Sequence, residues 1–577
     1  MAKIVLERDI EIPMRDGCVL RADLFRPDTP ERLPVLLNRT PYNKLAPMVF
    51  GMTLDATRAA LAGYNVLIQD CRGRFASDGK WDCFTVEARD GYDTIEWAAR
   101  QPWSDGKVGT YGPSYMGATQ WLAATGAPPS LKAMAPSVTA SDYHDGWTYQ
   151  GGAFELFFNV SWTMGALAPA TLMREREKNP GLGAELGNVV GSIDSMLEKM
   201  KHVPLLEYPM FRAGAPYFFD WLAHPGYDSY WRALSIEEHH PKINVPALNI
   251  GGWYDIFQRG TVRNYAGMRA RGGSESARAN QQLFVGPWNH AVPFANLVGD
   301  VDFGYRSNPI SSDVDGTQLR FFDRWLKGKS AADAPVRIYV MGINQWREEK
   351  EWPIPGVEYR RYFLHSRGRA NSSAGDGALA LEPPSSEPPD HFLYNPADPV
   401  PTRGGALCCY GAALNGGAYD QSAIESRADV LVYSTGPLAE DLEVTGPVTL
   451  TLYASSSAPD TDFTAKLVDV TECGFARNLT DGILRARFRE SQSSEVMLTP
   501  GKVAEFTIDL CNTSNVFLKG HRIRLEVSSS NFPRFDRNPN TGHPLFTDAE
   551  MRPALQTVMH DRQFASFLTL PVMPMRH

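Results

Sequence analysis

Apolar residues in the first 140 positions fall into short runs separated by a stretch with helical spacing. Residues 33–38 and 64–70 are apolar-rich runs of the length of buried strands, and residues 108–111 form a shorter one. Between the last two runs, residues 90–99 place apolar side chains three and four positions apart. Strand, helix and strand in this order predict an α/β fold, in which helices cover both faces of a parallel sheet.

A different pattern occupies residues 141–240, where apolar residues recur as on one face of an amphipathic helix. The clearest series is Leu186, Val189, Val190, Ile193, Met196, Leu197 and Met200. Strand signals return at residues 245–250 and 282–285, which would complete the sheet. We therefore expect a discontinuous α/β domain, residues 1–140 and 241–334, with a helical cap inserted between its two parts.

From residue 335 to residue 577 the alternation of apolar and polar residues has a period of two, as at 448–453 and 521–527. Turn residues separate these runs, and helical periodicity is sparse. The pattern predicts a jelly-roll β-sandwich domain over residues 335–577. Residues 370–390, which are rich in Ser, Gly, Ala and Pro, are expected to form a long surface loop.

Composition and charge narrow the range of partners. The 577 residues are 43% hydrophobic and 21% charged, which is typical of a globular protein with several domains. The net charge of -9 is not accompanied by a basic block, so neither a nucleic acid nor an anionic membrane is an expected partner. The N-terminus lacks the pattern of a signal peptide, and no run reaches the ~18 apolar residues of a membrane helix. The predicted location is the cytoplasm.

The cysteine pattern favours reduced thiols. There are seven cysteines, an odd number, and they form no C-x-x-C pair. The neighbours Cys408 and Cys409 are expected to pack as small apolar residues or to line a pocket. Residues 237–240 (EEHH) lack metal-ligand spacing and a third ligand, so we interpret them as a solvated helix start or loop. No metal and no organic cofactor are predicted.

Ser114 is the first candidate for chemistry. The segment 109–118 predicts a strand, a sharp turn at Gly112 and a helix that begins on small residues, with Ser114 at the bend. A serine that acts as a nucleophile needs an exposed position of this kind. The spacing is G-x-S-x-x-G, which alone is also compatible with a strand-to-helix turn and a capping serine.

Asp255 and His290 complete a possible catalytic triad with Ser114. Each follows one of the predicted strands, and the carboxyl ends of parallel strands form the edge at which α/β folds build their sites. Taken singly, Asp255 would be a turn former and His290 a helix cap. In the chain order Ser, Asp, His, which is that of α/β-hydrolases, the three predict nucleophile, acid and general base.

Two groups are candidates for an oxyanion hole. The backbone N–H of Tyr115, the residue after the candidate nucleophile, would point into the same space as Ser114. The hydroxyl of Tyr42 follows the strand at 33–38 and would reach the same sheet edge. A buried structural tyrosine is an equally good interpretation of Tyr42 on these grounds.

Several motifs together resemble the cocaine esterase family of hydrolases, which is related to X-Pro dipeptidyl peptidases and α-amino acid ester hydrolases. The motifs are RTPY (39–42), QDCRGRFAS (69–77), GPSY (112–115), GWYD (252–255), VGPWNH (285–290), DTDFTAKLVDV (460–470) and SSSNFPR (528–534). The resemblance covers nearly the whole chain. It implies an α/β-hydrolase fold with a helical cap and a C-terminal jelly roll, and it assigns the triad and oxyanion roles to the residues named above.

The resemblance also implies an acyl pocket. Trp162 and Phe257 match the aromatic positions of that pocket, and the alternative for Trp162 is a place in the core of the cap. Cys408 and Cys409 stand where the family pattern has bulkier apolar residues, so this departure leaves the substrate open. An ester with an aromatic or branched acyl group is the expected small-molecule substrate.

Two alternatives remain. An X-Pro dipeptidyl aminopeptidase or an α-amino acid ester hydrolase would need carboxylates near the acyl pocket to bind an ammonium group, and Asp142, Asp145 and Glu155 are the candidates. A non-catalytic binding protein would use the β domain alone. C-terminal β domains often form subunit interfaces, so a homodimer is considered, but no sequence feature identifies one.

Overall fold

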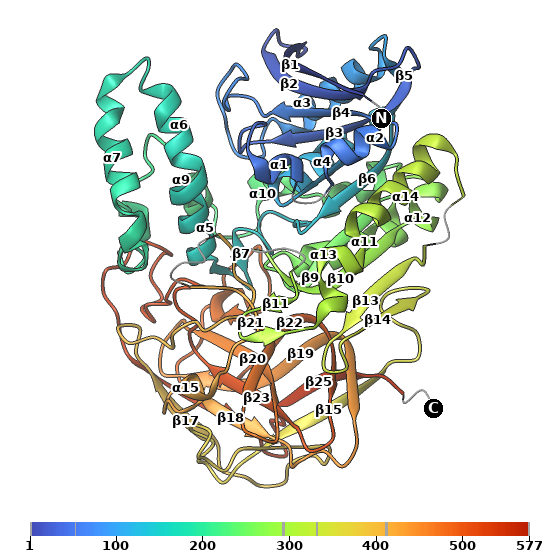
Figure 1. Cartoon of the computed structure of the whole chain (residues 1–577). Helices are drawn as coiled ribbons and strands as arrows, with labels where there is room; N and C mark the ends of the chain where they lie inside the picture. Colours follow the sequence, from blue (N-terminus) through green and yellow to red (C-terminus); the bar gives the residue numbers. More distant parts are fainter. Residues whose placement is uncertain (1–2, 52–53, 291–294, 331–332, 410–413, 575–577) are drawn as a thin grey trace.

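The computed structural model describes residues 3–574 except 52–53, 291–294, 331–332 and 410–413. Strands from the first part of the chain form a ten-stranded sheet (Figure 1). Its strands are, in spatial order, β1 (Ile4–Pro13), β2 (Val19–Pro27), β4 (Asn65–Asp70), β3 (Leu33–Thr40), β5 (Ser104–Pro113), β6 (Leu131–Ser137), β9 (Leu248–Tyr254), β10 (Gln282–Asn289), β13 (Val336–Val340) and β14 (Gln345–Glu349). Neighbours from β4 to β13 are parallel, and the outer pairs are antiparallel.

Alternate side chains of a strand point to opposite faces of the sheet, and helices cover both faces here. Leu37 belongs to a core that includes α3 (Glu87–Ala99), α4 (Tyr115–Thr125) and α11 (Gln258–Arg271). Its neighbour Leu36 belongs to a second core, with α2 (Ala56–Leu61) and α14 (Val314–Lys327). The mixed α/β fold with a large central sheet is therefore confirmed.

The sheet extends beyond the limit at residue 334 that the sequence suggested. Strand β13 pairs in parallel with β10, and β14 pairs with β13, so both belong to the first sheet. Residues 345–349 (QWREE) hold a single apolar residue and follow no period of two, and none of them is fully buried. Sequence periodicity therefore could not assign it to one sheet rather than the other.

The segment between β6 and β9 is mostly helical, as expected. It contains the short strands β7 (Tyr149–Gln150) and β8 (Ala153–Phe154), and then α5 (Leu156–Trp162), α6 (Ala168–Glu175), α7 (Gly183–Gly191), α8 (Met196–Lys199), α9 (Tyr217–Ala223) and α10 (Ser229–Leu234). The amphipathic series at 186–200 is not one helix: α7 ends at Gly191, and a 3₁₀ turn at Ile193–Ser195 precedes α8. Glycine is a poor helix former, which explains the break.

The C-terminal part is a β domain whose strands form a second sheet. Its strands are β15 (Glu358–His365), β16 (Ala378–Ala380), β17 (Asp390–Tyr394), β18 (Leu431–Ser434), β19 (Leu442–Ser456), β20 (Asp462–Val470), β21 (Ala476–Arg485), β22 (Ala504–Phe517), β23 (Arg522–Ser528), β24 (Ala554–Met559) and β25 (Phe567–Val572). The predicted surface loop at 370–390 is exposed over much of its length but contains β16. It ends on buried Asp390, which accepts hydrogen bonds from Ala370 and Tyr433.

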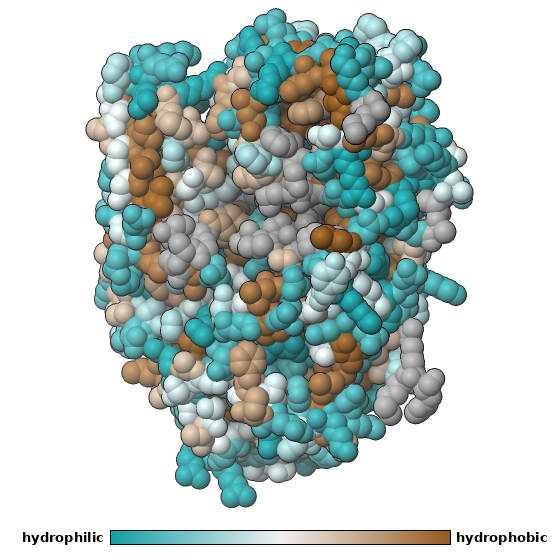
Figure 2. All heavy atoms as spheres, in the orientation of Figure 1, coloured by the Kyte–Doolittle hydropathy of each residue, from teal (hydrophilic) through white to brown (hydrophobic). Residues whose placement is uncertain are grey.

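In the part of the chain that the structure describes, one helical run has the length and hydropathy of a membrane span, although polar residues interrupt it. This run is Leu156–Glu175, and 67% of its most apolar window is buried inside the protein. A buried core helix meets the same criteria. Figure 2 shows hydrophilic residues over much of the visible face, with hydrophobic residues among them where α6 and α7 stand in Figure 1.

Candidate active site

Ser114 lies at a sharp bend between β5 and α4. Its backbone has φ 58° and ψ −124°, a conformation that costs a non-glycine residue about 1–3 kcal/mol. The bend is held on both sides, because the Ser114 N–H donates to the carbonyl of Ser137 (2.9 Å) and the Ala118 N–H donates to the carbonyl of Ser114 (3.0 Å). The hydroxyl consequently stands at the carboxyl edge of the sheet.

Two glycines make this bend sterically feasible. A Cβ at Gly112, where φ is 133°, would lie 2.8 Å from Cβ of Met116 and 3.0 Å from Nδ2 of Asn38. A Cβ at Gly117 would lie 2.8 Å from the side chain of Thr139. Larger residues would push α4 away from the sheet, so the glycine spacing around Ser114 is a packing requirement.

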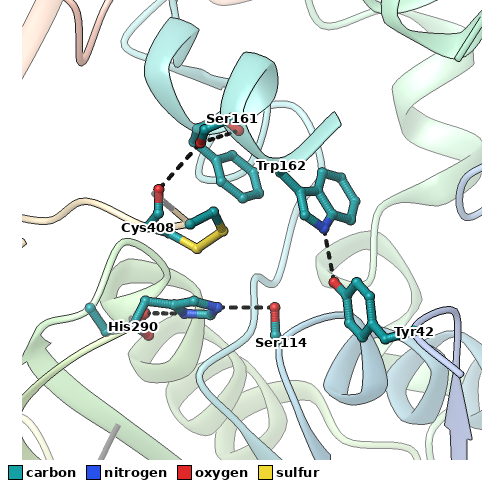
Figure 3. Close-up of a disulfide and its surroundings, with 9 residues drawn as sticks. Tyr42, Ser114, Ser161, Trp162, His290 and Cys408 are labelled. Atoms are coloured by element: carbon teal, nitrogen blue, oxygen red, sulfur yellow. Dashed lines mark hydrogen bonds and ion pairs between the residues drawn. A yellow bond between two sulfur atoms is a disulfide. The ribbon is translucent and has the colours of Figure 1, made fainter. Parts of the chain in front are cut away.

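His290 lies beside Ser114 (Figure 3), and Asp255 contacts the other side of the imidazole. His290 Nε2 is 3.0 Å from Ser114 Oγ, and His290 Nδ1 is 2.7 Å from Asp255 Oδ1. The parallel neighbours β10 and β9 end immediately before His290 and Asp255, which explains why the two side chains meet. The Asp255 side chain is fully buried, so its carboxylate faces the imidazole without competition from bulk water.

Tyr42 stands across Ser114 from His290 in Figure 3. Its hydroxyl oxygen accepts a hydrogen bond of 2.9 Å from Nε1 of Trp162. Burial raises the pKa of Tyr42 well above its ordinary value, so the phenol keeps its proton at neutral pH. Since the oxygen already accepts from the indole, the O–H is left to donate to another group.

Tyr115 opens α4, where the first backbone N–H groups have no acceptor within the helix. Its side chain is buried and engaged elsewhere: the hydroxyl donates to Oε1 of Glu87 and accepts from the N–H of Phe84, both at 3.0 Å. Glu87 also pairs with Arg39 at 2.9 Å. Only the backbone of Tyr115 is therefore free to serve the site, and Glu87, which the sequence did not single out, anchors the ring.

Aromatic rings line one side of the site. Trp162 stacks on Phe158 with centroids 5.3 Å apart, and the Phe257 ring meets the His290 ring edge to face at 5.1 Å. Trp147 connects the two groups, because its ring centroid lies 4.2 Å from that of Phe257 and 5.3 Å from that of Trp162. Sequence reasoning missed Trp147 and Phe158, although the aromatic-rich composition of residues 143–162 marked the region.

Cys408 and Cys409 form a disulfide, which corrects the expectation of reduced thiols for this pair. The other five cysteines are free. An odd number of cysteines rules out complete pairing but not a bond between neighbours, and such a bond depends on the local backbone rather than on the fold. Figure 3 shows the disulfide close to His290, and the Ser161 hydroxyl donates to the carbonyl of Cys408 at 3.4 Å.

The EEHH segment forms a 3₁₀ helix, Glu237–Lys242, and it is only partly solvated. His240 is fully buried, with Nε2 3.1 Å from Oδ1 of Asn264, because α11 packs over it. Among the described residues, no group of three His, Cys, Asp or Glu side chains could hold a metal ion.

The three carboxylates considered for ammonium binding have other partners. Asp145 forms ion pairs of 3.0 Å with Arg259 and Arg263. Asp142 accepts hydrogen bonds from the backbone N–H groups of residues 144 and 145. Glu155 lies 3.7 Å from Arg534, and burial raises its pKa to about 7. Asp142 and Asp145 thus have partners without a ligand, whereas buried Oε2 of Glu155 has no hydrogen-bond partner among the described residues.

The chain matches two family models. The X-Pro dipeptidyl-peptidase (S15 family) model matches residues 16–292, and the X-Pro dipeptidyl-peptidase C-terminal non-catalytic domain matches residues 328–569. Cocaine esterase from Rhodococcus sp. (strain MB1 Bresler) is 39% identical in an alignment of 578 positions that covers 98% of each chain.

Two solved structures are similar over nearly their whole length. An aminopeptidase from the marine sediment archaeon Thaumarchaeota archaeon has a TM-score of 0.81 and 27% identity, covering 99% of this chain and 96% of that chain. An α-amino acid ester hydrolase has a TM-score of 0.81 and 26% identity, covering 99% and 97%. The family resemblance predicted from the sequence is thus confirmed: the chain belongs to the cocaine esterase family of hydrolases, and its residues 16–292 match the S15 family model.

Proposed function

We propose that Ser114, His290 and Asp255 form the catalytic triad of a serine hydrolase that cleaves carboxylic esters. The observation that carries this proposal is the unbroken pair of hydrogen bonds, 3.0 Å and 2.7 Å, from Ser114 through His290 to Asp255. The match to the S15 family model, and 39% identity with a protein named cocaine esterase, support ester hydrolysis as the reaction.

The geometry supports a two-step reaction. Ser114 Oγ attacks the ester carbonyl carbon while His290 Nε2 takes its proton, and Asp255 holds the imidazole tautomer and stabilises the imidazolium. The Tyr42 O–H and the Tyr115 N–H donate to the oxyanion. His290 then protonates the leaving alcohol, and a water molecule repeats the sequence on the acyl-enzyme to release the acid.

The aromatic rings around the triad support an acyl group with an aromatic or branched apolar body. Trp162 and Phe257 offer flat apolar faces within the cluster that also contains Trp147 and Phe158. Rings of this kind favour another ring through area burial and offset or edge-to-face contacts worth ~1 kcal/mol each.

The architecture is proposed to be an α/β-hydrolase domain with a helical cap and a jelly roll. The strand order of the first sheet and the helices between β6 and β9 support the first two assignments, with β13 and β14 added to the hydrolase sheet. The antiparallel pairs of the C-terminal sheet support the third.

Hydrolysis of p-nitrophenyl benzoate and butyrate by the wild type and by Ser114→Ala tests the triad. Activity that is lost in the variant, with an acyl adduct on Ser114 in the wild type by mass spectrometry, is the expected result. Unchanged hydrolysis by Ser114→Ala would refute the assignment. A faster turnover of an X-Pro anilide than of a phenyl ester would favour the aminopeptidase alternative, and no labelling by a fluorophosphonate would favour a binding protein.

A further inference from the structure

The loop that carries Cys408 and Cys409 is anchored to the strand that ends at the candidate general base. Gly405 and Gly417 exchange two backbone hydrogen bonds of 2.8 Å across the base of this loop. Nδ2 of Asn289, the residue before His290, donates to the carbonyl of Gly416 at 2.7 Å. The C-terminal β domain thus holds this loop directly against the first sheet.

The disulfide at this loop belongs to the site. Cys408 is buried in the same apolar cluster as Phe158, Trp162 and Phe257. Its carbonyl accepts from Ser161, the residue before Trp162. Figure 3 shows the disulfide on the same side of Ser114 as His290.

The bond has a local role rather than a stabilising one. A disulfide between adjacent residues closes a very short loop, so it removes little entropy from the unfolded chain. Cys409 has φ 85°, a conformation that residues other than glycine rarely adopt, and the covalent ring helps to hold it there. The bond therefore sets the shape of the wall that the two side chains present.

We propose that the Cys408–Cys409 disulfide is a reducible wall of the acyl-binding site whose redox state sets acyl-group selectivity. This inference rests on the proposed esterase function. Cys409 is exposed and Cys408 is buried, so attack begins at Cys409.

The reductant is a small dithiol. One of its thiolates bonds to Sγ of Cys409, the S–S bond breaks, and Cys408 leaves as a thiolate that takes a proton. The second thiol then displaces Cys409, which also gains a proton, and the dithiol closes its own disulfide. Two electrons and two protons pass from the dithiol to the cysteines.

Reduction changes the space beside the catalytic serine. Two sulfur atoms that are no longer bonded must separate to van der Waals distance, and each side chain gains its own rotamer freedom. The wall becomes bulkier and less rigid, which opposes a ring-bearing acyl group more than an acetyl group. We expect the oxidised enzyme to favour aromatic acyl esters.

The test compares kcat/KM for p-nitrophenyl benzoate and acetate before and after treatment with dithiothreitol, which is then removed by desalting. Thiols counted after denaturation should rise from five to seven, since five cysteines are free and two are paired. The benzoate-to-acetate ratio should fall at least about fivefold on reduction and recover on reoxidation. A ratio that stays within about twofold while the count rises would overturn the proposal.

Two variants separate this wall from other thiol effects. The double variant Cys408→Ser, Cys409→Ser has no disulfide to reduce, so its ratio should not respond to dithiothreitol. Cys473→Ser, which removes an exposed free thiol, should behave as the wild type. A count of seven thiols in the untreated protein, or of five after treatment, would contradict the proposal. Ester hydrolysis that persists in Ser114→Ala would instead contradict the esterase mechanism.

Discussion

The two sides of the site are built in different ways. On the serine side, Ser114, Asp255 and His290 follow β5, β9 and β10, and Tyr42 follows β3, all strands of one sheet. On the aromatic side, Trp162 comes from the inserted helices, and Cys408 from the C-terminal β domain. Strand spacing sets the positions of the first group, whereas contacts between parts far apart in the chain set those of the second. Reactivity and selectivity can therefore change independently in this fold.

Asp255→Asn breaks the serine side most directly. The amide cannot hold the imidazole in the required tautomer, so kcat for p-nitrophenyl butyrate should fall by about 10⁴-fold. Steady-state kinetics, with circular dichroism to check folding, measure the effect. Asp300→Asn, which alters an exposed ion pair with Arg403, is the matched control and should leave kcat unchanged. Equal kinetics for both variants would exclude a catalytic role for Asp255.

Tyr42→Phe removes one of the two proposed oxyanion donors and keeps the ring in place. We expect kcat to fall by about 10²–10³-fold with little change in KM, because the donor acts mainly in the transition state. The control is Tyr64→Phe, which deletes another tyrosine hydroxyl that donates to Asp323 at 2.7 Å. A rise in KM with an unchanged kcat would show that Tyr42 binds the substrate rather than the oxyanion.

Glu155→Gln tests the start of α5, the helix that carries Trp162 on the aromatic side. Glu155 directly precedes this helix and lies beside Arg534. Burial raises the pKa of Glu155 from 4.5 to about 7, so the folded state binds the proton more tightly than the unfolded state. The wild type should then lose stability as the pH rises from about 4.5 to 7, by about 3 kcal/mol from this group.

Urea unfolding at pH 5 and pH 8 measures this change. The Glu155→Gln variant should show a smaller decrease in the free energy of unfolding than the wild type over that range, because glutamine does not titrate. The exposed Glu275→Gln serves as the matched control and should keep the wild-type slope. An identical pH dependence in all three proteins would rule out a tightly bound proton on Glu155.

Trp162→Phe tests the aromatic side of the site, and its expected effect on activity is smaller than that of Asp255→Asn or Tyr42→Phe. The change shrinks the aromatic surface and removes the indole donor to Tyr42, so kcat/KM for the benzoate ester should fall about tenfold. The acetate ester should be affected less. Trp97→Phe, on the remote helix α3, is the control. If both esters lost activity to the same extent, Trp162 would act through Tyr42 and not through the acyl group.

The sequence by itself determined the elements whose patterns are local. Buried strand runs and the glycines around Ser114 predicted the central parallel sheet and the bend, because period and steric demand are properties of neighbouring residues. The order of Ser114, Asp255 and His290 after successive strands predicted a common sheet edge, and the structure places their side chains within hydrogen-bond distance.

Tertiary structure decided the strand pairing, burial and long-range contacts that sequence periodicity does not specify. The antiparallel edge strand β14 has no apolar–polar alternation in its sequence, so only its pairing with β13 assigned it to the first sheet. Burial of His240 depends on the packing of α11, which the polar EEHH motif does not reveal. The aromatic wall depends on contacts between distant segments, such as Ser161 with Cys408, which lie 247 residues apart, and no local pattern specifies such contacts. The Cys408–Cys409 bond depends on a local backbone conformation that neither periodicity nor cysteine spacing reveals.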